Sequence, residues 1–214
     1  MVKDMELFYE QRAGKVVAAL NKNLFEALYS PTVEQAVQEI LSRVPEGATV
    51  GAGGSLSLRQ MGILETLKKK GHTVFDHWEE GLDPAGVDEV RRRQLTSDVF
   101  LSSTNAVTAD GYLVNIDGSG NRVAAMTFGP KKVIVVAGLN KIVRDRESAI
   151  NRIKNEAAPL NFYRLNLPSP CAKTTFCMDC SPPARFCRVT AITEVKPAGI
   201  PEFCVIIVGQ NLGF

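Results

Sequence analysis

The sequence has no long apolar run. None of its uninterrupted apolar segments approaches the roughly 18 residues of a membrane-spanning helix. Residues 1–6 lead into a mixed polar and apolar stretch, whereas a secretory leader would begin with an apolar segment. We therefore expect a cytoplasmic protein without a membrane partner.

Neither sign of charge dominates. The chain has 25 Lys and Arg against 23 Asp and Glu, which gives a formal net charge of +2 over 214 residues. Proteins that bind nucleic acid or an anionic membrane mainly by charge carry a clear basic excess. We therefore expect no nucleic-acid partner. The length and the hydrophobic share of 45% are typical of one α/β domain with a small appendage.

Cysteines are few but concentrated, since four of the five lie within residues 171–187 in the spacing C-x5-C-x2-C-x6-C. These four residues are Cys171, Cys177, Cys180 and Cys187. Because disulfides rarely persist in the cytoplasm, the group favours metal binding or redox chemistry. Four thiolates match the ligands of a zinc ion or an iron–sulfur cluster. The fifth, Cys204, lies in an apolar run and is expected to be structural.

Helix and strand signals alternate along most of the chain. Apolar positions at helical spacing within residues 4–29 and 33–41 predict an N-terminal helical pair. The later segments predict an α/β fold with a mainly parallel sheet and helices on both faces. We expect residues 1–45 to pack as helices on a main domain, residues 46–214, that includes a Cys-rich loop at 168–190. The expected strands are residues 49–50, 73–75, 98–103, 112–116 (in a β-hairpin), 132–138 and 205–208.

Two polar segments stand where predicted strands end. Residues 50–55 (VGAGGS) form a glycine turn, in which backbone N–H groups can converge on a phosphate or carboxylate. The turn is not a Walker loop, and Leu56 replaces the last glycine of G-x-G-x-x-G. Residues 102–111 (SSTNAVTADG) place hydroxyls and amides at the edge where parallel sheets bind ligands. On the residues alone, a structural turn explains either segment equally well.

Together with residues 129–138 (GPKKVIVVAG), these segments resemble the LUD family, named for lactate utilisation and typified by the LutC-type proteins. The resemblance covers roughly residues 5–210 and is carried most specifically by residues 106–114 (AVTADGYLV) and 129–138. It implies a fold like that of sugar-phosphate isomerases, CoA transferases and formyltetrahydrofolate cyclo-ligase.

The resemblance also implies that the glycine turn and the polar strand-end loop face one anion-binding cleft. The residues expected around this ligand are Gly51, Gly53, Gly54, Ser55, Thr104, Asn105, Asp110 and Gly111. The family offers no agreed catalytic residue, so the catalytic group stays unknown. Asp110 is the carboxylate best placed to act as a base, although backbone geometry explains its position before Gly111 equally well.

The cysteine run resembles a Cys-rich C-terminal extension found in a subset of LUD proteins. We expect the four cysteines to hold an iron–sulfur cluster of the 4Fe-4S type. Zinc is an alternative because it accepts the same ligands, and a metal-free thiol or disulfide arrangement is a third option. Lys173, Arg185 and Arg188 are expected to lower the pKa values of the thiols.

Family members are associated with the oxidation of lactate to pyruvate beside iron–sulfur and oxidoreductase partners. We therefore expect an accessory, electron-transfer protein of lactate or other organic-acid utilisation. Its partners would be a small anion and an oxidoreductase or iron–sulfur protein, with a homo-oligomer as a further option. One alternative is a stand-alone transferase or isomerase for a small anionic metabolite, with a structural zinc or thiol clamp. Another is a non-catalytic ligand-sensing or scaffold protein, so whether the chain is an enzyme stays open.

Overall fold

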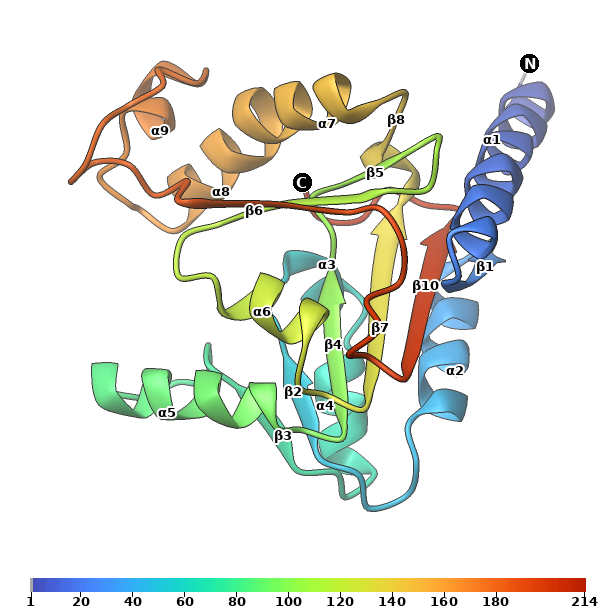
Figure 1. Cartoon of the computed structure of the whole chain (residues 1–214), viewed down its shortest axis with the longest axis horizontal. Coiled ribbons are helices and arrows are strands. Elements are labelled where there is room, and N and C mark those ends of the chain that lie inside the picture. Colours follow the sequence, from blue (N-terminus) through green and yellow to red (C-terminus); the bar gives the residue numbers. More distant parts are fainter. Residues whose placement is uncertain (1) are drawn as a thin grey trace.

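The computed structural model describes residues 2–214, with side chains from Asp4 onward. Its centre is a six-stranded sheet in the order β1-β10-β7-β4-β2-β3, in which every neighbouring pair is parallel (Figure 1). The strands are β1 (Glu26–Ser30), β2 (Val50–Ala52), β3 (Val74–Asp76), β4 (Val99–Ser103), β7 (Lys132–Gly138) and β10 (Glu202–Val208). The predicted α/β fold with a mainly parallel sheet is confirmed.

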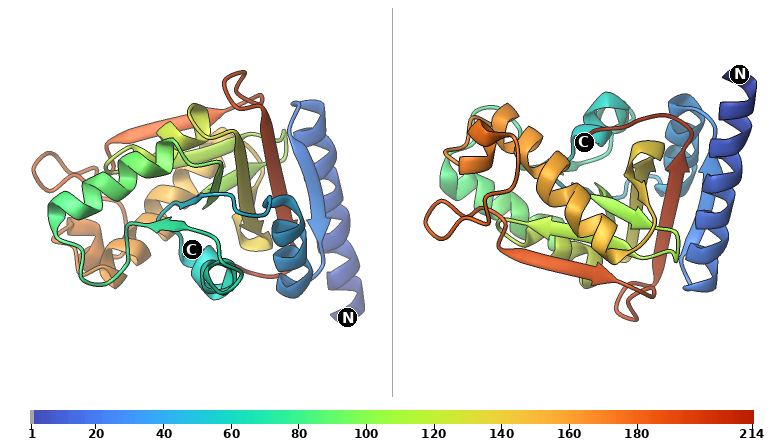
Figure 2. Two further views of the ribbon diagram at one scale, coloured as in Figure 1. Left: turned by 90° about the horizontal axis from the view of Figure 1, so that it is seen from below. Right: turned by 90° about the horizontal axis from the view of Figure 1, so that it is seen from above.

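Helices cover both faces of this sheet, as Figures 1 and 2 show. On one face, α2 (Val33–Arg43), α3 (Leu56–Gln60) and α4 (Ile63–Lys69) pack around a core that includes Ile40 and Ile206. On the other face, α1 (Val2–Lys22) and α6 (Asn121–Thr127) pack with Leu20 and Val135. Helix α5 (Pro84–Leu95) lies beside β2 and β3. No helix in the described part of the chain is long and apolar enough to cross a membrane.

A second, four-stranded sheet lies against the first in the order β8-β5-β6-β9. Its strands are β5 (Ala106–Thr108), β6 (Leu113–Asp117), β8 (Ile142–Val143) and β9 (Val189–Thr193). The expected β-hairpin is confirmed, because β5 and β6 pair antiparallel. The helical segments that follow or cover this sheet are η1 (Leu139–Lys141), α7 (Arg146–Arg152), the π-helix η2 (Ile153–Ala157), α8 (Ala158–Arg164) and α9 (Pro170–Thr174).

The N-terminal region differs from the expected helical pair. Leu24 has φ of 66°, a left-handed conformation that ends the helical path, and the next residues form β1. The Asn21 side chain stabilises this reversal, because its Nδ2 donates to Ala27 O (3.0 Å) and its Oδ1 accepts from Ala27 N (2.9 Å). Strand β1 then pairs with β10. The first 45 residues therefore contribute a strand to the main sheet as well as two helices that pack on it.

Candidate functional site

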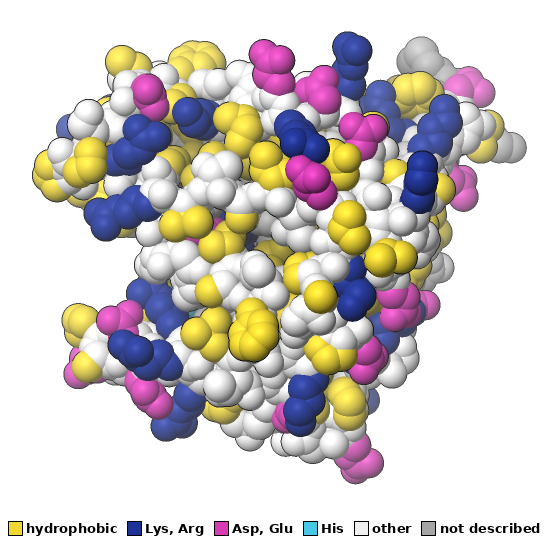
Figure 3. Space-filling view, viewed as in Figure 1, with side chains coloured by type: hydrophobic (Ala, Val, Ile, Leu, Met, Phe, Trp, Pro, Cys, Tyr) yellow, Lys and Arg dark blue, Asp and Glu magenta, His cyan; other side chains and the backbone are white. Residues whose placement is uncertain are grey.

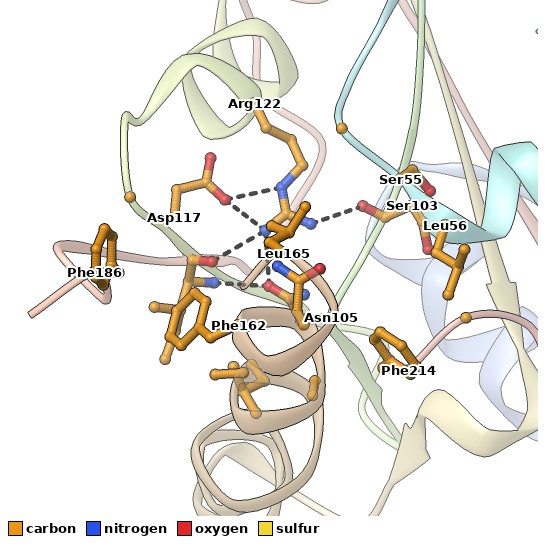
Figure 4. Close-up of a pocket in the computed structure, with 18 of the residues that line it drawn as sticks. Ser55, Leu56, Ser103, Asn105, Asp117, Arg122, Phe162, Leu165, Phe186 and Phe214 are labelled. Atoms are coloured by element: carbon orange, nitrogen blue, oxygen red, sulfur yellow. Dashed lines mark hydrogen bonds and ion pairs between the residues drawn. The ribbon is translucent and has the colours of Figure 1, made fainter. Parts of the chain in front are cut away.

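A cavity of about 440 Å³ lies where the carboxyl ends of parallel strands meet. Residues that follow five of the six strands line this cavity. Gly54 and Ser55 follow β2, and His77 and Trp78 follow β3. Ser103, Thr104 and Asn105 lie at the end of β4, Lys141 follows β7, and Phe214 follows β10. Parallel α/β sheets bind their ligands at this edge. Figure 4 shows the opposite wall, where Phe162 and Leu165 from the α8 region and Phe186 from the Cys-rich loop face the strand ends.

The mouth of the cavity is cationic. Figure 3 shows a recess in the surface with Lys and Arg side chains on both sides of it. The indole of Trp78 lies between two guanidinium groups, with Arg59 Cζ 5.2 Å and Arg164 Cζ 5.0 Å from its ring centroid. Burial, together with the positive charge of Arg59, lowers the pKa of Arg164. The Nε of Arg91, which also lines the cavity, is buried and has no hydrogen-bond partner in the described structure.

Lys141 forms the floor of the cavity, and only 4% of its surface is exposed. Its Nζ lies 2.7 Å from Ser103 Oγ and 3.0 Å from Ser57 Oγ. Burial, with smaller contributions from the positive charges of Arg152 and Arg122, lowers the pKa of Lys141 from 10.5 to about 7. Among the described residues, no carboxylate forms an ion pair with this amine.

Arg122 joins the end of β4 to β6. Its Nε donates to Asp117 Oδ1 (2.9 Å) and its Nη2 to Asn105 Oδ1 (2.7 Å), as drawn in Figure 4. The guanidinium also donates to the backbone carbonyl of Ser103. Arg152 fixes the same loop from the other side, since its Nη1 donates to Asn105 O (2.7 Å). Arg122 and Asp117 thus line the cavity as an ion pair, whereas the buried Arg152 supports the loop at Asn105 without lining the cavity itself.

The Cys-rich loop surrounds a second, smaller cavity of about 20 Å³. Cys171, Cys177, Cys180 and Cys187 all line it. Its wall also includes Phe162 and Phe186, whose rings lie 5.6 Å apart between centroids. Because Phe162, Phe186 and Cys187 line both cavities, the cysteine loop adjoins the larger one directly.

Comparison with known proteins agrees with this arrangement of strands. The family model of the LUD domain matches residues 13–208. The chain belongs to the LUD domain family. It also resembles a crystal structure of a DUF162 family protein from Deinococcus radiodurans, with a TM-score of 0.55 and 12% sequence identity over 94% of this chain and 98% of that one. At this identity the likeness shows the fold alone. Among curated proteins, no significant match is found.

Half of the expected ligand residues line the larger cavity of this LUD domain. They are Gly54, Ser55, Thr104 and Asn105. Gly51 and Gly53 lie next to it but pack against the protein, since a Cβ would stand 2.8 Å from Ser97 Oγ at Gly51 and 2.8 Å from Ser102 Oγ at Gly53. These two glycines therefore allow close backbone packing beneath the glycine turn, and they are not among the residues that line the cavity.

Asp110 and Gly111 lie elsewhere, in the turn between β5 and β6 that packs on α1. Gly111 has φ of 78°, and a Cβ there would stand 2.6 Å from Leu20 N. Asn23 Nδ2 donates to Asp110 O (2.8 Å), which holds the turn against the helix. Neither residue lines the cavity, so the structure does not bring Asp110 and Gly111 together with the glycine turn as expected.

The four cysteines lie around one cavity, so their thiols act on one another. Burial, followed by the charges of the other three cysteines, raises the pKa of Cys187 to about 11. The expectation that neighbouring cations lower the thiol pKa is therefore wrong for Cys187, where the opposing effect of Arg185 is the smaller one. Within the described residues, no three or more Cys, His, Asp or Glu side chains stand at positions that could hold a metal ion. The four thiols match a metal in donor chemistry and share one small cavity, but their sulfurs do not stand at positions that would hold an ion without moving.

Cys204 is separate from this group. It is buried in β10, and burial raises the pKa of its thiol to about 12. The prediction of a structural role agrees with this position, because a buried and protonated thiol is inert.

Sequence reasoning missed Lys141, Arg122 and Ser57. Lys141 comes three residues after the last residue of β7, so the rule that ligands bind at strand ends could have found it. Arg122 follows residues 117–121 (DGSGN), whose composition is typical of a turn and gives no sign of a buried arginine. Nothing in the sequence around Ser57 shows that its hydroxyl meets a lysine 84 residues away.

Proposed function

We propose that this LUD-domain protein is an accessory protein of lactate or other organic-acid utilisation. It binds a small organic anion in the larger cavity and carries a thiolate-bound metal centre, an iron–sulfur cluster in preference to zinc, in the adjoining loop. The observation that carries the proposal is the shared wall, in which Phe186 and Cys187 line both cavities. A redox centre beside a metabolite site is the arrangement that an electron-transfer protein requires.

The charges in the cavity support an anionic ligand. Lys141 and Arg122 line the cavity, the buried Arg152 binds the backbone of Asn105 in its wall, and Asp117 forms an ion pair with Arg122. Burial, followed by the positive charges of Arg152 and Arg122, lowers the pKa of Lys141, and a bound carboxylate would offset the repulsion between these cations. A volume of about 440 Å³ lies in the usual range of small-molecule sites. The hydroxyls of Ser103 and Ser57 would add hydrogen bonds.

The residues that would hold the metal are the four cysteines of the loop. Lys154 and Arg185 lie beside them and would offset part of the thiolate charge. The backbone N–H of Asp179 donates to Cys177 Sγ (3.4 Å), which is the kind of contact that stabilises a thiolate ligand. An iron–sulfur cluster would supply one-electron transfer, whereas zinc would only brace the loop.

Replacing Lys141 by methionine is expected to weaken anion binding about tenfold to a hundredfold, because a charge-assisted hydrogen bond in a buried site contributes about 1.5–3 kcal/mol. Calorimetric titration with L-lactate and with pyruvate would measure this. Affinity of the unmodified protein for L-lactate should fall as the pH rises above about 7, where Lys141 loses its proton. Lys131→Met is the matched control, since that side chain is 79% exposed, and it should bind normally. Equal affinity in all three proteins would show that Lys141 does not bind the anion, and no binding in any of them would disprove the anion site.

Replacing Cys180 by serine is expected to remove most of the bound metal, because one of four thiolate ligands is lost. Cys204→Ala is the matched control, since Cys204 is buried in β10 away from the loop, and its metal content should be unchanged. Metal analysis of both variants after purification without oxygen gives the comparison. If Cys180→Ser retained the full metal content, the loop would not be the metal site. If its metal fell without any change in lactate affinity, the two cavities would act independently.

A further inference from the structure

The buried amine of Lys141 is held by hydroxyl groups alone. Ser103 Oγ donates to Thr104 O (3.2 Å), so its lone pairs are free to accept from Lys141 Nζ at 2.7 Å. Ser57 Oγ stands 3.0 Å from the same nitrogen and 3.4 Å from Ser103 Oγ. All three side chains line the larger cavity. A lysine with this environment differs from a structural salt-bridge lysine, which would face a carboxylate.

We propose that Lys141 forms a reversible imine with the carbonyl group of a 2-oxo acid bound in the cavity. The inference rests on the proposed anion-binding role of this cavity and names the class of anion. A 2-oxo acid would be held by charge and by a covalent bond, whereas the matching 2-hydroxy acid would be held by charge alone. The cavity would therefore distinguish the oxidised from the reduced member of such a pair.

The step balances without an oxidant or a reductant. The lone pair of the neutral amine attacks the carbonyl carbon, and the carbonyl oxygen takes up a proton to give a carbinolamine. Loss of the hydroxyl group as water, with the second proton of the nitrogen, leaves the carbon–nitrogen double bond. One amine and one carbonyl thus give one imine and one water. The hydroxyls of Ser57 and Ser103 lie within hydrogen-bond distance of the nitrogen and can carry these protons.

The charges around Lys141 favour the neutral amine that attack requires. Burial and the nearby guanidinium groups of Arg152 and Arg122 lower its pKa to about 7, so the neutral amine is far more populated at neutral pH than in an exposed lysine. Desolvation and neighbouring cations are the means by which imine-forming lysines are activated. Asp117 forms an ion pair with Arg122, and the charge of Glu156 acts to raise the pKa of Arg152. Neither carboxylate therefore stabilises the protonated form of Lys141 directly.

Arg91, a further cation that lines the cavity, offers a donor for the carboxylate of the oxo acid beside its own ion pair with Asp88 (3.1 Å). The Nε of Arg91 is a buried donor with no partner in the described structure, and it lines the cavity together with Lys141. The carbonyl and the carboxylate of a 2-oxo acid are adjacent, so a molecule whose carbonyl carbon meets Lys141 brings its negative charge into the same cationic cavity. This arrangement favours 2-oxo acids over uncharged ketones.

The test is reductive trapping in the full-length protein. Pyruvate and sodium cyanoborohydride, which reduces imines in preference to ketones, are expected to leave a carboxyethyl group on Lys141 that peptide mass mapping can locate. Exposed Lys131 serves as the comparison within the same sample. An ordinary lysine has about a thousandth of its amine neutral near pH 7.4, so Lys141 should be labelled at least about tenfold faster. Labelling should rise with pH through about 7, and excess L-lactate should suppress it.

The outcomes separate this inference from the proposed function. Labelling of Lys141 that lactate suppresses, and that is absent in Lys141→Arg, supports the imine. If calorimetry shows that pyruvate binds but Lys141 is labelled no faster than Lys131, the imine is overturned and the anion site stands. If neither pyruvate nor lactate binds and no label appears, both proposals fail. The mapping needs no variant, so a folding defect in Lys141→Arg would not obscure the result.

Discussion

Replacing Arg122 by methionine is expected to lower the free energy of unfolding by about 3–5 kcal/mol, the usual cost of removing one partner of a buried ion pair. The side chains of Arg122 and Asp117 are only 12% and 8% exposed. Without the guanidinium, the Asp117 carboxylate would stay buried without a counter-charge, and Asn105 Oδ1 would keep only the backbone N–H of Ile116 as a donor. Urea denaturation followed by circular dichroism would measure the loss.

Two further variants show whether the loss of stability comes from the ion pair between Arg122 and Asp117. Arg144→Met removes an arginine whose side chain is 91% exposed, and it should change stability by less than about 0.5 kcal/mol. The double variant Arg122→Met with Asp117→Leu removes both charges and should recover part of the loss, because no unpaired carboxylate remains. A loss below about 1 kcal/mol in Arg122→Met would show that the ion pair does not support the cavity wall.

The second large effect is on the pH dependence of stability. In the folded protein the pKa of Lys141 is about 7, well below its ordinary value of 10.5. Between these two values the unfolded chain binds more protons at this site than the folded chain, so the contribution of Lys141 to stability increases as the pH rises. In the middle of this window, the contribution of Lys141 to the free energy of unfolding increases by about 1.4 kcal/mol for each pH unit.

The free energy of unfolding of Lys141→Met, relative to that of the unmodified protein, should therefore be greatest at low pH. We expect the difference in unfolding free energy between the two proteins to change by about 2–3 kcal/mol from pH 6 to pH 9, in favour of the unmodified protein as the pH rises. Titration of the cysteines cancels in this difference because both proteins contain them. Lys131→Met should run parallel to the unmodified protein at every pH. A pH-independent difference for Lys141→Met would show that the buried amine keeps an ordinary pKa.

The sequence predicted the parts of the fold whose signals are local. Strands β4 and β7 are apolar runs with turn signals on both sides, and both were found. Strand β1 was missed because the helical spacing of Leu24, Phe25 and Leu28 continues past the end of α1. The reversal depends on the left-handed backbone at Leu24 and on the hydrogen bonds of Asn21 to Ala27, and no spacing rule reveals either.

The candidate site was predictable only in part for the same reason. Ser55 and Asn105 follow strand ends, so their position at the carboxyl edge of the sheet could be expected. Asp110 belongs to the same polar segment as Asn105, but the hairpin carries it along β5 to α1. The meeting of Lys141 with Ser57 joins residues that are far apart in the chain, so only the folded structure brings them together.

The most direct test of the account is the content of iron, acid-labile sulfide and zinc in protein purified without oxygen. The account predicts iron and sulfide near four of each per chain, as a cluster held by four cysteines requires. One zinc without sulfide would contradict the electron-transfer role and leave the loop as a structural clamp. Protein without any of the three would contradict the metal centre itself, and the function would then rest on the anion-binding cavity alone.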